Sequence, residues 1–295
     1  MNESLRRAIE RAAGFESDAQ WRHVGATGWG DAWSLARRDR LCFVKLADEK
    51  RGDMLAAEAD GLRAIASTRT IRVPDVIAVG AHGPETYLVV EWLDMAPGID
   101  AVATARALAR MHRAVPPCGP ASQRFGWHRD NWIGGTAQAN GWRDDWVAFF
   151  RDCRLAPQLA LASANGFRGS VERDGERVLA RLPKLLRTHD VQPSLVHGDL
   201  WAGNAAMLAG DEPVVFDPAV YVGDREVDVA MTELFGGFGA AFARAYAAEW
   251  PLDAGYPLRR DIYNLYHLLN HLNLFGAGYR TRVEQTLERI LTAAG

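Results

Sequence analysis

The stretch His197-Gly-Asp-Leu-Trp-Ala-Gly-Asn204 decides the fold of this chain. It places Asp199 and Asn204 five residues apart, and Asp217 follows the apolar run 213–216 further along the chain. Taken singly, each of these polar residues is typical of a loop or a turn. As an ordered set beside short apolar strands, they indicate side chains that converge on one site.

Residues of these types suit one kind of chemistry. Transfer of a phosphoryl group to a hydroxyl requires an acceptor for the hydroxyl proton and oxygen ligands for Mg²⁺. Carboxylate and amide oxygens are the ligands that Mg²⁺ prefers. The sequence therefore predicts Asp199 as the catalytic residue that accepts the proton, and Asn204 and Asp217 as magnesium ligands. The alternative is that all three only form hydrogen bonds within loops and turns.

One lysine lies in an unusual place for its charge. Lysine is rare here, because only three of the 34 basic residues are lysines. Lys45 lies in the apolar run Leu-Cys-Phe-Val-Lys-Leu-Ala, where an unpaired ammonium group is costly. Glu58, in a predicted helix over 54–67, is the expected partner, since a kinase fold uses such a pair to direct the lysine to the ATP phosphates. The alternative is an edge-strand lysine that faces solvent.

A glycine cluster and a later strand complete the predicted nucleotide site. Glycines allow backbone N–H groups to approach phosphate oxygens, so Gly28 and Gly30 are predicted to bind ATP. A plain hairpin turn fits this segment equally well. The run Tyr87–Leu93 reads as a strand that leads into a hinge, and Glu91 and Leu93 mark the place where backbone groups would bind adenine.

The periodicity of the chain changes near residue 92. Residues 40–46, 76–80 and 87–91 read as strands around the helix 54–67. Helical periodicity is found over 3–13, 102–113, 142–161, 171–186, 227–234, 242–249 and 259–275. We therefore predict an α+β, bilobal, protein-kinase-like fold. Its nucleotide-binding lobe, residues 1–92, holds a small antiparallel sheet and one main helix, and its catalytic and acceptor-binding lobe, residues 93–295, is mostly helical.

Composition narrows the range of partners. A formal net charge of −3 favours neither nucleic acid nor a membrane surface as a partner. The cysteines, Cys42, Cys118 and Cys153, lack metal-ligand spacing and favour a reducing compartment. The charged N-terminal residues do not resemble a signal peptide, and no run reaches the roughly 20 apolar residues of a membrane span. We expect a cytoplasmic protein; its oligomeric state stays open.

Several blocks of sequence are more specific than the catalytic loop alone. They are Phe43–Leu46, Ala57–Leu62, Asp130–Gly134, His197–Asn204, Asp217–Asp228, Ala230–Gly237 and Tyr263–Phe275. Through them nearly the whole chain resembles the fructosamine kinase family, a branch of the aminoglycoside phosphotransferase and choline kinase-like superfamily. One departure is that the usual Gly-Gly pair of the nucleotide loop reads Trp29-Gly30 here, which places the phosphate contacts of that loop in doubt.

The resemblance implies a reaction and a substrate class. It implies ATP-dependent phosphorylation of ketosamines, the sugar–amine adducts of glycation, at a sugar hydroxyl. A 3-phosphoketosamine is unstable, so the amine is released and the protein or amino acid is deglycated. An aminoglycoside, choline or small-sugar kinase and a nucleotide-binding pseudokinase stay open as alternatives, as does the choice among fructosyl, ribosyl and erythrulosyl adducts.

Aromatic and polar residues provide candidates for the acceptor site. Trp201, two residues beyond Asp199, could stack on a sugar face or pack between the lobes. His267, Asn270 and His271 lie on one helix and either line the acceptor pocket or bond within the core. No third ligand accompanies the two histidines for zinc. By default, Trp127, Trp132, Trp142 and Trp146 are predicted to be core residues of the C-terminal lobe.

Overall fold

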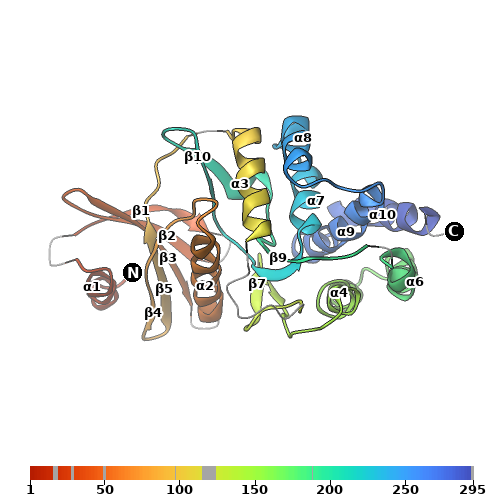
Figure 1. The fold of residues 1–295 in the computed structure, drawn as a ribbon. Helices are drawn as coiled ribbons and strands as arrows, with labels where there is room; N and C mark the ends of the chain where they lie inside the picture. The colour runs from red at the N-terminus through yellow and green to blue at the C-terminus, as the bar shows by residue number, and fades with distance from the viewer. Residues whose placement is uncertain are drawn as a thin grey trace.

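A computed structural model describes residues 1–15, 19–27, 30–48, 51–96, 98–114, 124–187 and 189–293. A sheet with two helices occupies its N-terminal part, and a larger, mostly helical part follows (Figure 1). This arrangement is the predicted α+β fold. The boundary near residue 92 and the cytoplasmic location stay predictions. In the described residues, no helix is both long and apolar enough to cross a membrane.

The N-terminal sheet is antiparallel, with strand order β1-β2-β3-β5-β4. Its strands are β1 (Gln20–Thr27), β2 (Gly30–Arg37), β3 (Arg40–Asp48), β4 (Val76–His82) and β5 (Glu85–Glu91). Successive side chains of a strand face opposite sides of a sheet. Val89 accordingly packs with Leu5 and Ile9 of helix α1 (Glu3–Ala12), whereas Leu88 and Val90 pack toward helix α2 (Gly52–Thr68).

This alternation determines where Lys45 points. Lys45 on β3 pairs in register with Leu88 on β5, so both side chains lie on the α2 side of the sheet. Figure 1 shows α2 between the sheet and the C-terminal part of the molecule. Helix α2 approaches that part closely, because a Cβ at Gly61 would lie 3.2 Å from Pro218 and 3.3 Å from Val220. A larger side chain there would push the helix away from the residues that follow Asp217.

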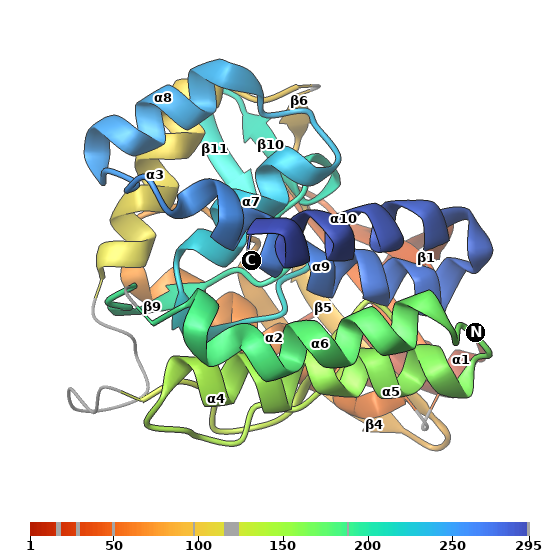
Figure 2. The ribbon, with the colours of Figure 1, turned by 90° about the vertical axis from the view of Figure 1, so that its right-hand side faces the viewer.

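Helices form most of the C-terminal part. They are α3 (Ala101–Arg113), α4 (Trp146–Phe150), a π-helical turn (Arg151–Leu155), α5 (Ala156–Ala164), α6 (Ser170–Leu185), α7 (Glu226–Leu234), α8 (Gly239–Glu249), α9 (Tyr256–Phe275) and α10 (Arg280–Ala293). Figure 2 shows α5, α6, α9 and α10 packed together, with α9 and α6 each in contact with both α5 and α10. The loops that carry Asp199 and Asp217 do not belong to these helices; they follow the short strands described next.

Short strands connect these helices and carry the loops of the site. They form three small antiparallel sheets: β11-β10-β6, β12-β9 and β7-β8. Their bounds are β6 (Met95–Ala96), β7 (Asn131–Ile133), β8 (Thr136–Gln138), β9 (Pro193–Val196), β10 (Ala205–Leu208), β11 (Glu212–Val215) and β12 (Tyr221–Asp224). The catalytic-loop sequence leaves β9, and Asp217 follows β11.

Two sequence-based predictions in this part are wrong. The helix predicted over 142–161 begins at Trp146, because the side chain of Asp145 accepts a hydrogen bond from the N–H of Ala148 at 2.7 Å and caps the helix there. Of the four tryptophans predicted to be core residues, Trp127 and Trp146 are buried and the half-buried Trp142 packs against the core, but Trp132 is half-buried and is not among the described residues of the core cluster.

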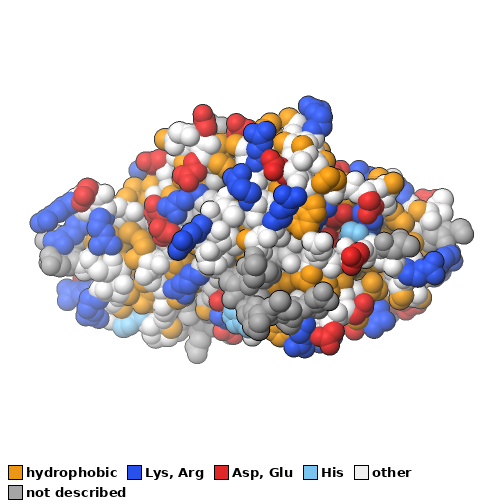
Figure 3. All heavy atoms as spheres, viewed as in Figure 1, with side chains coloured by type: hydrophobic (Ala, Val, Ile, Leu, Met, Phe, Trp, Pro, Cys, Tyr) orange, Lys and Arg blue, Asp and Glu red, His pale blue; other side chains and the backbone are white. Residues whose placement is uncertain are grey.

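Two further sequence features can be compared with the structure. Cys42 and Cys153 are buried free thiols, and Cys118 lies outside the described residues. Basic and acidic side chains are interspersed over the face of the molecule shown in Figure 3. On this face we find no large area of a single charge sign that would suit a nucleic acid.

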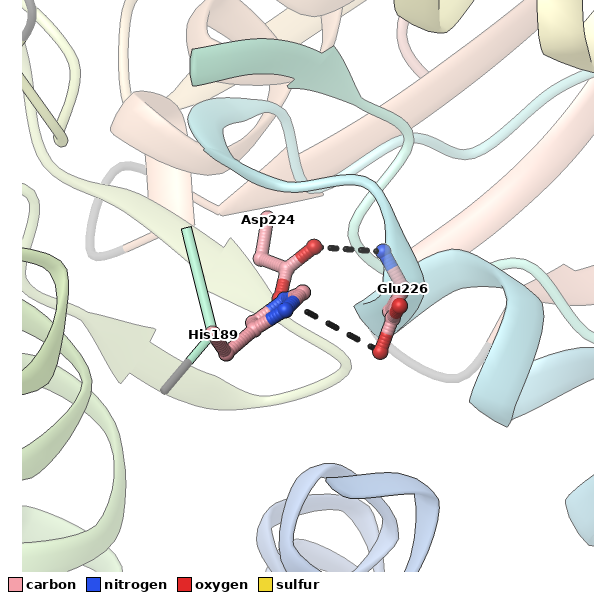
Figure 4. Close-up of side chains that lie close together, drawn as sticks. All are labelled: His189, Asp224 and Glu226. Atoms are coloured by element: carbon pink, nitrogen blue, oxygen red, sulfur yellow. Dashed lines mark hydrogen bonds and ion pairs between the residues drawn. The ribbon is translucent and has the colours of Figure 1, made fainter. Parts of the chain in front are cut away.

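His189 lies beside Asp224 of β12 and Glu226 of α7 (Figure 4), and residues of α9 bond the same two carboxylates. His189 Nε2 lies 2.6 Å from Asp224 Oδ2, and the hydroxyl of Tyr263 donates to the same oxygen. Arg259 donates to both oxygens of Glu226, at 2.6 and 2.8 Å. Three of these groups, His189, Asp224 and Glu226, lie close enough to hold a metal. Because protein donors already bind both carboxylates, we interpret the cluster as structural.

The charge on His189 should make stability depend on pH. Burial opposes protonation, but the Asp224 carboxylate raises the pKa of His189 above its usual 6.5 in the folded state. Its contribution is therefore complete below pH 6.5 and is lost as the pH rises through the folded pKa. We expect His189→Gln to lower Tm more at pH 6 than at pH 9, by roughly 2–4 °C.

Thermal unfolding scans from pH 5.5 to 9 measure this difference. His82→Gln is the matched control, because His82 bonds the hydroxyl of Ser4 and not a carboxylate. An equal loss of Tm at both ends of the pH range for His189→Gln would contradict the charged role of this histidine.

Candidate active site

Two adjoining cavities lie between the sheet and the helical part, and Lys45, Glu58 and Asp217 line both. The first, of about 260 Å³, is also lined by Met54, Leu55, Asn131, Trp132, Gly134, Asp199, Trp201, Asn204 and Pro218. The second, of about 250 Å³, is also lined by Phe43, Leu62, Val90, Glu91, Trp92, Leu93, Met95 and Phe216. The first cavity is the more polar, and the second is mostly apolar.

Lys45 is paired with two carboxylates. Its Nζ lies 2.7 Å from Glu58 Oε1 and 2.6 Å from Asp217 Oδ1. The side chains of Lys45 and Glu58 are only 13% and 17% exposed, so the ammonium group could not rely on water. Burial works against its charge, but Glu58 and Asp217 raise the pKa of Lys45 above its usual value. The structure thus places beside Lys45 the partner expected from the sequence.

Asp199 lies in the loop after β9, with Asn204 directly beside it. The side-chain amide of Asn204 donates to the backbone oxygen of Asp199 at 2.9 Å and to its Oδ2 at 3.3 Å. Burial, together with the nearby charge of Asp217, raises the pKa of Asp199 to about 7. A carboxylate that titrates near the working pH is well suited to act as a general base.

Asp217 is held beside Asn204 by the backbone. The N–H of Phe216 donates to the backbone oxygen of Asn204 at 3.1 Å. Asp217 itself has φ +55°, in the left-handed region that non-glycine residues rarely adopt and that often marks functional positions. The amide of Asn204 donates to Asp199, so its Oδ1 is the atom left to bind a cation. One carboxylate and one amide oxygen fit a hard cation such as Mg²⁺.

A buried aspartate on α7 holds the catalytic loop from behind. Asp228 Oδ2 accepts from the N–H of His197 at 2.7 Å and from Nε2 of His112 at 3.0 Å, and its Oδ1 accepts from the N–H of Gly198 at 2.9 Å. Gly198 has φ +82°, and a Cβ there would lie 2.1 Å from the oxygen of Ala219. The loop can therefore fold against Asp228 only with glycine at this position.

Sequence reasoning did not identify Asp228 or His112. Burial opposes the charge of Asp228, but hydrogen bonds from His112 and the loop backbone hold the pKa of Asp228 below its usual value. A signal was present, since Asp228 stands among apolar residues of a predicted helix, where an acid needs a buried partner. Its partners could not be named from the sequence.

The other residues predicted to bind ATP, two glycines and two residues near the end of β5, do not all line a cavity. Leu93 lines the apolar cavity. Glu91 also lines it, but its side chain binds the guanidinium group of Arg72. Gly30 begins β2, and a Cβ there would lie 1.9 Å from the oxygen of Leu46, so close strand packing requires this glycine. Gly28 lies outside the described residues.

The predicted acceptor residues separate into two groups. Trp201 lines the polar cavity beside Asp199 and is 42% exposed. His267, Asn270 and His271 are not among the residues that line either cavity. Asn270 is buried and bonds Gln158, and burial lowers the pKa of His267 to about 3, which keeps it neutral. The assignment of these three α9 residues to the acceptor stays a prediction.

The β7 segment contributes to the cavity in a way that the sequence did not suggest. Asn131, Trp132 and Gly134 line the polar cavity together with Asp199. Their sequence block contributes to the family resemblance, but the sequence predicts Trp132 only as a core residue. Half-burial of its indole instead leaves a surface that an acceptor could contact.

Comparison with known families now adds to this geometry. The family model described as fructosamine kinase matches residues 1–293. The chain belongs to the fructosamine kinase family. The predictions of this family, of the kinase-like fold and of a phosphotransferase acting on an alcohol group are therefore confirmed.

Individual relatives agree with the family. A probable ketoamine kinase of Synechocystis sp. is 47% identical over 261 residues, covering 88% of this chain and 86% of that protein. The chloroplastic protein-ribulosamine 3-kinase of Arabidopsis thaliana is 39% identical over 251 residues, covering 84% and 76%.

Solved structures agree as well. The crystal structure of a Thermobifida fusca protein assigned as a fructosamine-3-kinase has a TM-score of 0.85 at 30% identity, covering 99% of this chain and 100% of that one. An aminoglycoside phosphotransferase, solved in complex with gentamicin, shares the fold with a TM-score of 0.65 at 12% identity.

The Asp228 network leads to a stability prediction. In Asp228→Asn, the amide nitrogen would face a donor, so at least one buried donor loses its partner. We expect a loss of roughly 2–5 kcal/mol of unfolding free energy, because an unpaired buried polar group is costly. Urea unfolding measures it. Asp144→Asn, at an 84% exposed carboxylate paired with Arg124, is the control and should change stability by less than about 0.5 kcal/mol. Equal, small effects of the two substitutions would contradict the anchoring role.

Proposed function

We propose that this protein transfers the γ-phosphoryl group of Mg-ATP to a sugar hydroxyl of a ketosamine, and that breakdown of the phosphorylated adduct then releases the amine. The observation that carries the proposal is the convergence of Lys45, Asp199, Asn204 and Asp217 on one cavity in a member of the fructosamine kinase family. The relatives named as ketoamine and ribulosamine kinases support the substrate class.

The nucleotide is proposed to span both cavities. Adenine would occupy the apolar cavity, between Leu62 and Phe216 and against the backbone near Leu93. Lys45, already cationic and aligned by Glu58, would bind the α- and β-phosphates. Asn204 and Asp217 would hold Mg²⁺, which would offset the negative charge of the phosphates. Lys45 would then exchange its contact with Asp217 for a phosphate.

The acceptor is proposed to enter the polar cavity. Its hydroxyl oxygen forms a bond to the γ-phosphorus, the bond from that phosphorus to the β,γ-bridging oxygen breaks, and ADP leaves. Asp199 takes the hydroxyl proton, a role that its raised pKa supports. The indoles of Trp201 and Trp132 would contact the sugar.

The first test separates a kinase from a binder. Wild-type protein with Mg-ATP should phosphorylate a fructosyl- or ribulosyl-lysine derivative, detected by mass spectrometry. Asp199→Asn keeps the shape of the side chain but loses the base, so turnover should fall by roughly 10²–10⁴ while calorimetry shows similar Mg-ATP binding.

Two outcomes of these measurements would contradict the proposal. Phosphorylation of an aminoglycoside or choline, with no ketosamine product, would reject the substrate class. Mg-ATP binding without turnover of any acceptor, unchanged in Asp199→Asn, would indicate a pseudokinase.

The second test concerns the two indoles. Trp201→Ala and Trp132→Ala should each raise the acceptor KM, roughly tenfold if the lost contact with the sugar is worth about 1.4 kcal/mol, with the ATP KM little changed. Trp142→Ala, at a half-buried indole outside both cavity linings, is the control. Parallel losses of Tm and of affinity for both substrates would instead indicate a packing role.

A further inference from the structure

A segment between α3 and β8 connects the helical part of the molecule to α2. We call residues 124–134 the bracing segment. Gly126 and Val222 of β12 exchange backbone hydrogen bonds at 2.9 and 2.8 Å, and the N–H of Trp127 donates to the oxygen of Asn140 at 2.8 Å. Its backbone therefore belongs to the C-terminal part, on the side of β12 that carries no other strand of the described sheets.

The side chains of this segment reach across to α2. Nε1 of Trp127 donates to Asp60 Oδ2 at 2.7 Å, and the indole is only 3% exposed. His128 Nε2 lies 3.3 Å from the same oxygen. Asp60 is two residues after Glu58 on α2, so this contact lies within one helical turn of the carboxylate that aligns Lys45.

A second attachment lies after the C-terminal end of α2. The backbone of Arg72 bonds β11, with the N–H of Val215 donating to the oxygen of Arg72 at 3.0 Å. The guanidinium group of Arg72 binds Glu91 at the end of β5. Helix α2 is thus attached to the C-terminal part by the bracing segment near its middle and by the Arg72 loop after its end.

We infer that Asp60 and Trp127 are positioning residues for the proposed phosphoryl transfer. They fix α2 against the C-terminal part, so that Glu58 holds Lys45 opposite Asp217 before a nucleotide binds. Without the bond from Trp127, α2 would be held to the C-terminal part by the Arg72 attachment and by the van der Waals contacts of Gly61 with Pro218 and Val220. These contacts are less directional than a hydrogen bond and would allow Glu58 to shift relative to Lys45. Displacement of about 1 Å at a reacting group can cost about 100-fold in rate. The inference rests on the proposed kinase function, but its first readout is nucleotide binding.

Substitutions at the two residues can remove the bond while they keep the packing. Trp127→Phe removes the N–H donor and retains an aromatic ring. Asp60→Ala removes the acceptor, whereas Asp60→Asn retains an oxygen that can accept from the indole. Trp146→Phe is the matched control, because the buried indole of Trp146 also donates one hydrogen bond, to Tyr263 at 3.1 Å, on a residue outside both cavity linings.

We expect Trp127→Phe and Asp60→Ala to weaken Mg-ATP binding by calorimetry and to lower kcat/KM for ATP by about 10- to 100-fold. The acceptor KM should change little, and Asp60→Asn should recover most of the loss. Trp146→Phe should lower Tm to a similar extent without a change in ATP affinity. If Trp127→Phe and Trp146→Phe lower only Tm, the positioning role is wrong.

A double-mutant cycle tests whether the effect passes through Glu58. In a Glu58→Gln background, Trp127→Phe should reduce ATP affinity little further, since the carboxylate that it positions is already gone. Additive losses would overturn the inference. Its failure and that of the proposed function remain distinguishable: a wild type that phosphorylates no ketosamine rejects the function, while Mg-ATP affinities of the same variants still decide the role of Asp60 and Trp127.

Discussion

The burial of the Lys45 ammonium group is the constraint on which the rest of the site depends. A charge on an apolar strand must find partners in the protein, and these come from α2, through Glu58, and from the turn after β11, through Asp217. Satisfying one charge thus brings β3 and α2, which follow one another in the chain, together with a turn 172 residues beyond Lys45. The two cavities meet at these three side chains, so the ion pairs that stabilise the fold also mark the place where phosphates would be bound.

Much of this arrangement could be predicted from the sequence. The run of Lys45 in apolar surroundings, the helical period around Glu58, and the order Asp199, Asn204, Asp217 all depend on local patterns, and the structure brings these residues together. Asp228 with His112 and Asp60 with Trp127 could not be paired in this way. Their partners lie 116 and 67 residues apart, and only the packing of helices on short strands decides such contacts.

In two cases the local sequence pattern could not distinguish a core residue from a residue that lines a cavity. Polar residues on α9 could line a pocket or form hydrogen bonds within the core. The helical periodicity of the sequence is the same in these two cases. The structure buries His267 and Asn270 at 3% exposure, away from the two cavity linings. Trp132 presents the reverse case, since a tryptophan is a core residue by default. It lies on a strand of three residues, too short for its alternation to show which face is covered.

In the proposed reaction, the bracing segment would contact both the helix that aligns Lys45 and the cavity that would hold the acceptor. Trp127 bonds the helix that aligns Lys45, and Trp132, five residues later in the chain, lines the cavity that holds Asp199. In-line transfer requires the attacking oxygen and the γ-phosphorus to be held at a fixed separation. In the proposed reaction, the bracing segment would restrict this separation, because it bonds α2 through Trp127 and lines the polar cavity through Trp132, so a shift of α2 away from that cavity would strain the bond between Trp127 and Asp60.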